Sequence, residues 1–422
     1  MKTPISPYHR TKIDGGATLL VKERRDQPIV AVNFWVATGS ANEDPNVNGI
    51  SHFFEHIFFK GTEKYPKGEM DRRVKAMGGY NNAATSYEFT HYYIVIPSWH
   101  FRTAVDLLAD ALLHPAIDSE DVEKERMIIR EEIRRRDDNP GARLFTLLQE
   151  EIFDGTPYAF PILGREESLK NIGARELKAY YGRHYVLPNV VVVVVGDVAV
   201  GEAEEVVRKL LKSGAGRRAE RPDRRELRIL PPERKRDRFE DKDINQVYAA
   251  IGFHTPGMTE RELIPTLEVA ATALGGGKSS RLYQRLLERE KLVSSIEAWH
   301  MELRHAGVFG IDTIFRPGRE PEVNQCLFEE IRRVIDRGLE DEEIARAKVI
   351  LRSSFLYENE TNGSISGTLG YYEVGFGDAD VVLTYLERID RVGKEEVRAV
   401  LDQYLKNRPF ARVVIGPKEE RI

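Results

Sequence analysis

The stretch His52-Phe53-Phe54-Glu55-His56 places two imidazoles and a carboxylate along one side of a predicted helix, and it decides how the chain is interpreted. His52 and His56 are four residues apart, so their side chains lie one above the other on the same helix face. Two neutral imidazoles at this spacing can reach one metal ion, and Glu55 lies beside them, available as a general base. The alternative is an apolar, buried helix in which the pattern arises by chance. Burial favours the metal, because two histidines and a glutamate among phenylalanines are costly without a shared partner.

Zinc is the metal that this pattern favours, and a catalytic zinc ion needs a third protein ligand beside its open position. A second predicted helix, residues 118–133, starts with capping and acidic residues, as helix N-termini do. Glu125 and Glu132 are seven residues apart in it, two turns, and share an apolar stripe. We predict Glu132 as the third ligand and Glu125 as a residue that supports a ligand. Glu123 and Glu131 fit the alternative of a charged, solvated helix face.

The order HxxEH inverts the HExxH motif of many zinc peptidases. Together with the distal glutamates it resembles the pitrilysin or insulinase family of zinc metallopeptidases, in the branch that includes mitochondrial processing peptidase. That family has one glutamate 76 residues after the second histidine and another seven residues earlier, which here are Glu132 and Glu125. The first half shares further motifs with the family: Gly78-Gly79-Tyr80-Asn81-Asn82-Ala83, Pro157-Tyr158, Pro161-Ile162, Gly164, Tyr181, Tyr185, Pro188-Asn189 and Gly196-Asp197.

The resemblance implies a function and a set of site residues. One Zn²⁺ per chain would be held by His52, His56 and Glu132, with Glu55 as the catalytic base and Glu125 orienting a ligand or the incoming peptide. The implied activity is that of an endopeptidase that cleaves peptides or small unfolded polypeptides bound in extended form.

Substrate binding is expected at residues 82–85 and at the strand predicted over residues 87–96, where a peptide can bind by strand addition. The substrate-binding residues would be Asn82, Ala83 and Ala84, with Asn82 contacting the substrate backbone. Without the resemblance, Asn81-Asn82 would be interpreted as an ordinary turn.

Composition fits a globular enzyme of more than one domain. The chain has 422 residues and a formal net charge of −5, which argues against a nucleic-acid partner. A single cysteine, Cys326, excludes an internal disulfide and is compatible with a reducing compartment. The valine run 190–195 is too short for a membrane span, and the first residues lack the apolar region of a signal peptide. We therefore expect a cytoplasmic protein without a membrane partner, or a periplasmic one if a signal peptide has been removed.

An internal repeat organises the chain. Residues 122–133 can be laid over residues 344–355 with an offset of 222, and strands ending in glycine close each half near residues 196 and 416. Period-2 strands, such as residues 29–36, and amphipathic helices, such as residues 101–113, predict an α+β fold of two homologous domains. Each domain would be a mainly antiparallel sheet with helices packed on one side. The predicted boundaries are 1–213 for the zinc-binding domain, 214–238 for a solvated linker and 239–422 for an inactive domain.

The second half lacks the metal-binding side chains. Under the same offset, Ala347 and Ser354 replace Glu125 and Glu132, and the helix predicted over residues 263–274 has no histidine. The glycine triplet 275–277 lacks the features of a phosphate-binding loop and is interpreted as a helix end and turn.

A departure from the family pattern follows this turn. Active members carry an arginine and a tyrosine seven residues apart on the next helix, where they stabilise the oxyanion. Here those positions are Leu287 and Ser294. Two-chain members divide the zinc site and the Arg/Tyr pair between homologous subunits. We therefore predict the zinc-bearing subunit of a heterodimer, with a homodimer less favoured. The alternative is a non-catalytic structural or assembly subunit of the same fold, which the intact ligand set argues against.

Overall fold

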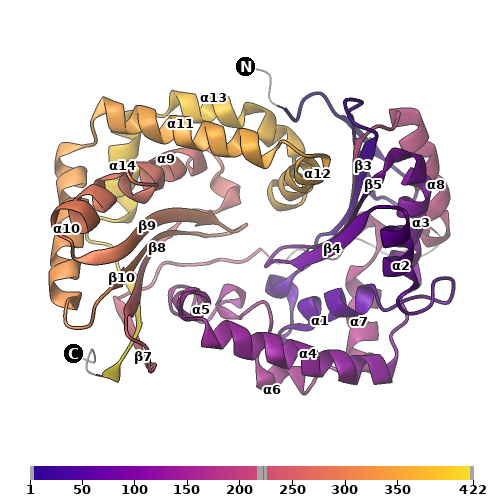
Figure 1. Ribbon diagram of the computed structural model, residues 1–422, viewed down its shortest axis with the longest axis horizontal. Coiled ribbons are helices and arrows are strands. Elements are labelled where there is room, and N and C mark those ends of the chain that lie inside the picture. The colour runs from indigo at the N-terminus through magenta and orange to yellow at the C-terminus, as the bar shows by residue number, and fades with distance from the viewer. Residues whose placement is uncertain (1–3, 216–221, 223–225, 419–422) are drawn as a thin grey trace. The chain divides into compact units, whose positions relative to one another are not determined.

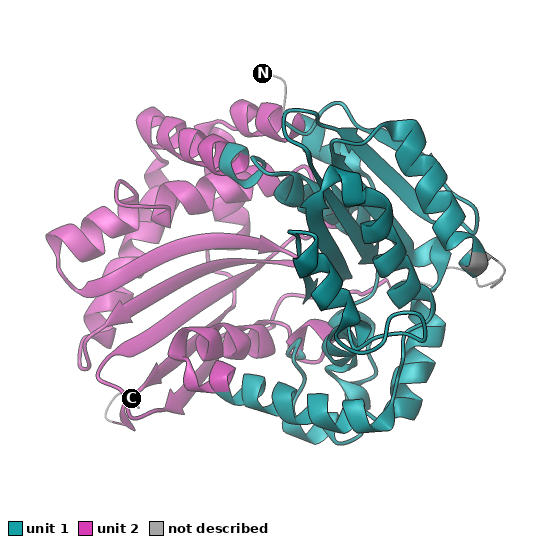
Figure 2. Ribbon diagram, turned by 45° about the vertical axis from the view of Figure 1, so that its right-hand side comes forward, with its two compact units in different colours: residues 1–134, 160–225, 356–383 teal, residues 135–159, 226–355, 384–422 magenta. Residues whose placement is uncertain are grey.

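A computed structural model describes residues 4–215, 222 and 226–418, which form two compact units (Figure 2). Unit 1 comprises segments 1–134, 160–225 and 356–383. Unit 2 comprises segments 135–159, 226–355 and 384–422. Each unit is a sheet covered by helices, which confirms the predicted α+β class (Figure 1).

The sheet of unit 1 has the strand order β1-β2-β6-β3-β5-β4. Only the β2–β6 pair among these described strands is parallel, so the sheet is mainly antiparallel, as predicted. The valine run forms β6, which is buried throughout its length. The strands are β1 (His9–Lys12), β2 (Thr18–Glu23), β3 (Ile29–Val36), β4 (Tyr80–Thr85), β5 (Thr90–Pro97) and β6 (Val190–Gly196).

Most helices of unit 1 pack on one face of this sheet. Val30, Val32 and Phe34 of β3 point into the core there, together with apolar residues of α1, α3, α7 and α8. The helices of the unit are α1 (Ile50–Phe58), α2 (Glu69–Ala76), α3 (Phe101–Leu113), α4 (Ser119–Asp138, whose end continues into unit 2), α6 (Glu166–Leu169), α7 (Ala174–His184), α8 (Val200–Ala215) and α12 (Asn362–Tyr371).

Helix α12 comes from the second half of the chain and covers the other face of the same sheet. Asn33 and Trp35, which alternate with the core residues of β3, face it. A Cβ atom at Gly370 would lie 2.1 Å from the Trp35 ring, so only glycine permits the helix to approach this closely.

The sheet of unit 2 repeats the arrangement, with the order β7-β11-β8-β10-β9 and one parallel pair, β7–β11. Its strands are β7 (Arg236–Asp241), β8 (Val247–Thr255), β9 (Val293–Glu302), β10 (Gly307–Phe315) and β11 (Phe410–Gly416). Its helices are α5 (Pro140–Ile152), α9 (Ile264–Gly275), α10 (Glu320–Arg337), α11 (Asp341–Glu358, whose end continues into unit 1), α13 (Tyr385–Arg391) and α14 (Lys394–Tyr404). Strands β2, β6, β3, β5 and β4 thus correspond in order to β7, β11, β8, β10 and β9.

The repeat extends to the helix on the second face. Helix α5, from the first half of the chain, packs on β8 and β11, where its Leu148 and Ile152 lie against Gly252. Helix α5 begins at residue 140 and α12 at residue 362, an offset of 222. Each unit therefore receives one helix from the other half of the sequence.

The compact units interleave along the chain, whereas the boundaries 1–213, 214–238 and 239–422 follow the sequence repeat and remain a prediction. Residues 216–221 and 223–225 of the predicted linker lie outside the described residues. Asn81 and Asn82 lie within β4, so the interpretation of these residues as a turn is wrong; the turn is at Gly78, which has a positive φ of 77°. Among the described helices, none combines the length and apolar character needed to span a bilayer.

Candidate metal centre

Helix α1 carries the three polar residues of the motif on one side and an apolar face on the other. Phe53, Phe54, Ile57 and Phe58 are fully buried in the core of unit 1. His52, Glu55 and His56 are partly buried. Burial of the phenylalanine face fixes the rotation of the helix about its axis, so the polar stripe has a defined direction.

Helix α4 brings a carboxylate to both histidines. Glu132 Oε2 lies 3.6 Å from His52 Nε2 and 3.5 Å from His56 Nε2. One ligand atom of each of the three side chains lies within 4.8 Å of the others. No other group of three such side chains occurs among the residues that the structure describes. The arrangement brings together the three residues predicted as metal ligands.

Glu125, one helical repeat before Glu132, contacts the opposite side of the His56 ring. Its Oε2 accepts a hydrogen bond from His56 Nδ1 at 3.0 Å, and its Oε1 pairs with Lys60 Nζ at 2.5 Å. Because a carboxylate can only accept, Nδ1 carries the proton, and the lone pair of His56 Nε2 is left for a metal. Glu125 is 4% exposed, so the Lys60 charge compensates a buried anion.

The two imidazoles differ in their affinity for protons. Burial and the neighbouring His56 lower the pKa of His52 to about 4, against the opposing charge of Glu132. Burial alone would also lower the pKa of His56, but hydrogen bonds to Glu132 and Glu125 raise it overall. Burial and His56 therefore favour a neutral ring at His52, whereas Glu125 and Glu132 favour a positive charge at His56 when no cation is bound. A divalent cation bound by both Nε2 atoms and Glu132 would satisfy the same carboxylates.

Glu55 takes no part in this contact between carboxylates and imidazoles. It is bound instead by a residue of β4. Its Oε2 accepts a hydrogen bond from Thr85 Oγ1 at 2.5 Å. Burial raises the pKa of Glu55, while the hydrogen bond from Thr85 lowers it. The charges of His56 and Glu132 also act on this pKa, so Glu55 lies close to the metal-binding atoms without being one of their partners.

The residues predicted to bind substrate lie on β4, which ends the order of strands in its sheet. Asn82 and Ala84 are exposed on one side of the strand, whereas Ala83 points the other way and packs against the core. Asn82 Oδ1 accepts a hydrogen bond from the Ala83 backbone N–H at 2.9 Å. The predicted substrate-binding stretch is thus an edge strand that carries Thr85, the partner of Glu55.

Lys60 and Thr85 were not predicted to support the site. Lys60 follows the motif by four residues, a helical spacing from His56, which is the one signal that could have indicated it. Thr85 lies 30 residues from Glu55, and no local pattern connects the two residues.

Among its described residues, unit 2 has no comparable centre. Helix α9, which packs on β9 as α1 packs on β4, is buried along its length and contains no histidine. Ala347 is 1% exposed and fills core space, and Ser354 is exposed. The glycine triplet ends α9, as predicted, with Gly277 in a turn at a φ of 83°.

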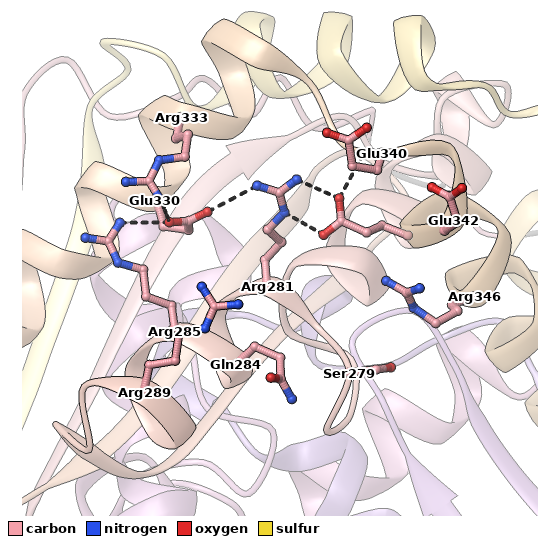
Figure 3. Close-up of a pocket in the computed structure, with 11 residues that line it drawn as sticks. Ser279, Arg281, Gln284, Arg285, Arg289, Glu330, Arg333, Glu340, Glu342 and Arg346 are labelled. Atoms are coloured by element: carbon pink, nitrogen blue, oxygen red, sulfur yellow. Dashed lines mark hydrogen bonds and ion pairs between the residues drawn. The ribbon is translucent and has the colours of Figure 1, made fainter.

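The segment after this turn is fixed by ion pairs (Figure 3). Arg281 contacts Glu343 at 2.5 Å and Glu330 at 3.4 Å, and Arg285 contacts Glu330 at 2.7 Å. These side chains line a cavity of about 440 Å³. Glu330 is 2% exposed, so the paired arginines are needed to balance a buried charge. We interpret the network as structural, because both arginines are engaged by carboxylates.

Comparison with known proteins identifies the family of the chain. Residues 18–166 match the family model described as insulinase (peptidase family M16), and residues 171–351 match the peptidase M16 inactive domain. The chain belongs to peptidase family M16. An uncharacterized zinc protease of Streptomyces coelicolor is 31% identical over 99% of this chain and 91% of its own length.

Other M16 relatives include an uncharacterized zinc protease of Bacillus subtilis, 27% identical over 97% of this chain and 98% of its own length. A probable mitochondrial-processing peptidase subunit beta of Arabidopsis thaliana is 26% identical over 97% of this chain and 78% of its own length. A crystal structure of a protease from Helicobacter pylori shares the fold, with a TM-score of 0.89 at 22% identity, covering 97% of this chain and 99% of that chain. The predicted family and the processing-peptidase-like character are thereby confirmed.

Proposed function

We propose that this M16 protein is a zinc-dependent endopeptidase in which His52, His56 and Glu132 hold one zinc ion. The observation that carries the proposal is the convergence of these three ligand atoms within 4.8 Å, with Glu55 held beside them by Thr85. A purely structural zinc site would be closed by four protein ligands and would have no use for a spare base. The zinc proteases among the relatives support the choice of metal.

The side chains of the centre have separate roles in this proposal. The chemistry that a bound zinc ion supplies is polarisation of the scissile carbonyl and activation of water. Glu55 takes the proton of the attacking water and delivers it to the leaving amine. Its raised pKa favours this role, because a more basic carboxylate accepts the proton more readily. Glu125 acts on His56 from the opposite side of the ring, where it fixes the tautomer that leaves Nε2 free.

We infer that substrate binds in extended form along β4. An edge strand presents backbone N–H and C=O groups that a peptide can pair with by strand addition. Asn82 and Ala84 would then contact the peptide, and Thr85 at the end of the strand joins this binding edge to Glu55.

The proposed active form is a heterodimer with a homologous subunit that supplies an arginine and a tyrosine. Both positions of this pair have other roles here: Leu287 packs against the core of unit 2, and Ser294 Oγ donates a hydrogen bond to the Ile314 carbonyl. Loss of an oxyanion donor typically lowers the rate by about 10²–10³-fold. The relative named as a subunit beta of a processing peptidase is consistent with such a division of roles.

Substitution of the base separates catalysis from metal binding. Glu55→Gln should retain one zinc ion per chain, measured by elemental mass spectrometry, and lose peptide cleavage by about 10²–10⁴-fold. Glu63→Gln, at an exposed position shortly after α1, is the matched control. It should leave the zinc content and the rate of peptide cleavage unchanged. Cleavage that survives in the Glu55 variant would exclude Glu55 as the base.

The heterodimer is tested with the isolated chain. Size-exclusion chromatography combined with a peptidase assay should show weak or no activity for the monomer or homodimer. A tagged chain should capture a companion of similar size that carries the missing arginine and tyrosine, and mixing the two should restore activity. Full activity of the chain alone would contradict this part of the proposal.

A further inference from the structure

A buried carboxylate lies directly before the metal-binding helix. Glu43 is 7% exposed and follows the short helix η1 (Ser40–Asn42). Its Oε2 accepts hydrogen bonds from the Gly49 backbone N–H at 2.7 Å and from Asn48 Nδ2 at 2.9 Å. Its Oε1 accepts one from the Ser51 backbone N–H at 2.8 Å. Both oxygens are therefore used, and two of the three donors are backbone amides at the start of α1.

Helix α1 depends on this acceptor because its own N-cap residue provides none. Gly49 is the N-cap, with a φ of 96°, and has no side chain to accept from the first amides of the helix. Such amides are costly when they are buried without a partner. Glu43 takes the place of an N-cap side chain from six residues away. Burial raises the pKa of Glu43 to about 7, whereas the hydrogen bonds from Gly49, Ser51 and Asn48 favour the charged form, which also suits the positive end of the helix dipole.

Other contacts hold the same segment in place. Asn48 Nδ2 also donates to the Pro161 carbonyl at 3.2 Å, and Ser168 Oγ donates to the Asn48 carbonyl at 2.7 Å. A Cβ atom at Gly49 would lie 2.8 Å from Gly164 Cα, so no larger residue fits at the N-cap. Asn48 and Gly49 thus fix the start of α1 against the 161–168 segment, and Glu43 binds both of these residues.

Glu43 accepts hydrogen bonds from amide N–H groups and forms no ion pair with a neighbouring cation among the described residues. Among the described residues, no lysine, arginine or histidine forms an ion pair with it. A glutamine could accept through one oxygen only, and its NH₂ group would face a backbone N–H. The hydrogen-bond pattern therefore requires a carboxylate.

We propose that Glu43 is a positioning residue of the metal centre, which sets the position of α1 so that His52 and His56 can both reach Glu132. Ser51, whose amide Glu43 binds, is the residue directly before His52. A small displacement of the helix start therefore moves the first ligand relative to α4. The inference depends on metal binding at this centre, but not on cleavage of a peptide.

The test measures metal affinity, for which Zn²⁺ and the spectroscopic probe Co²⁺ are suitable. Glu43→Gln should weaken Zn²⁺ binding by about 10–100-fold, the range typical of groups that orient metal ligands. Asp44→Asn is the matched control, because Asp44 is the adjacent acid and caps the short helix η2 (Pro45–Val47) in the same way. The control should bind Zn²⁺ like the unchanged protein. A merely structural role would lower the unfolding temperature of the Glu43 variant without changing the Zn²⁺ affinity of the folded protein.

Hydrogen exchange of the unchanged protein tests the same inference if the variant does not fold. Because coupling between two sites is reciprocal, Zn²⁺ binding should slow exchange of the Gly49 and Ser51 amides more than that of the α7 amides. The inference about Glu43 would be overturned if folded Glu43→Gln and Asp44→Asn bound Zn²⁺ with equal affinity. It would also be overturned if Zn²⁺ did not slow exchange of the Gly49 and Ser51 amides. Neither result would contradict the proposed function. Absence of Zn²⁺ binding by the unchanged protein would overturn the proposed function as well.

Discussion

The helix pair α1/α4 of unit 1 corresponds to the pair α9/α11 of unit 2. Helices α1 and α9 pack on corresponding strands of sheets with the same strand order, and α4 and α11 begin 222 residues apart. In the first pair, His52 and His56 of α1 contact Glu125 and Glu132 of α4. In the second, α9 is buried along its length and Ala347 packs into the core at the position of Glu125. The comparison shows that the fold does not require the metal centre. The same framework is stable with an apolar contact, so the polar residues of unit 1 are explained by chemistry.

Removing the third ligand should have the largest effect. Glu132→Ala is expected to weaken zinc binding by about 10²–10³-fold, because each ligand contributes about 2.5 to 4 kcal/mol of the roughly 10–16 kcal/mol typical of a four-ligand zinc site. Competition with a chelator of known affinity measures the change. Glu131→Gln is the control, since Glu131 faces solvent and pairs with Arg134. If Glu132→Ala binds zinc normally, the ligand assignment is wrong.

Introducing a charge into the α9/α11 pair should have the next largest effect, which is on the stability of the protein and not on zinc binding. Ala347→Glu recreates the first-half residue in a core without a histidine or lysine partner, and we expect a loss of about 3 kcal/mol in the free energy of unfolding. Ser354→Glu recreates the other position at an exposed site and should change stability by less than about 0.5 kcal/mol. Denaturation by urea, followed by circular dichroism, distinguishes the two. Equal effects would show that burial does not explain the difference between the repeats.

Removing the partner of His56 should have an intermediate effect. Glu125→Gln keeps the size of the side chain but removes the negative charge shared by His56 and Lys60. Zinc affinity should fall by about 10–100-fold. Glu123→Gln, on the exposed side of the same helix, should have no effect. If the Glu125 variant bound zinc with unchanged affinity, Glu125 would contribute to packing and not to zinc binding.

The smallest effect is expected at the strand that holds the base. Thr85→Val removes the hydrogen bond that lowers the pKa of Glu55, so that pKa should rise. Glu55 must be ionised to accept a proton, and the acidic limb of the kcat/KM profile should therefore move to higher pH. On the acidic limb, activity at a given pH should decrease by about tenfold, corresponding to a hydrogen bond worth about 1.5 kcal/mol, and the decrease should be smaller where Glu55 is ionised in both proteins. A profile that keeps its acidic limb would exclude Thr85 as a partner of the active base.

Much of the arrangement follows from local sequence patterns. Helix α3 and strand β3 occupy the residues that periodicity predicts, 101–113 and 29–36. The spacing of Glu125 and Glu132 on an apolar stripe predicts that both face the same neighbour, and both contact α1. These features depend on which side of a helix or strand a residue occupies, which the sequence determines.

The remainder depends on contacts between distant segments. Thr85 contacts Glu55 from a strand, and Glu43 contacts the start of α1 from a loop. Neither residue belongs to a periodic pattern with its partner. The exchange of α5 and α12 could not be predicted either, because amphipathic periodicity shows that a helix has a buried face but not which sheet covers it.

This exchange has a consequence for how the chain can be divided. A fragment that ends before residue 214 would leave Trp35 and Asn33 of β3 uncovered, because α12 is encoded more than 140 residues later. The complementary fragment would expose Gly252 and its surroundings, which α5 covers in the intact chain. Neither piece is self-sufficient, so proteolysis in the middle of the polypeptide yields two parts that persist only by remaining associated, as the complementary fragments of a nicked protein do.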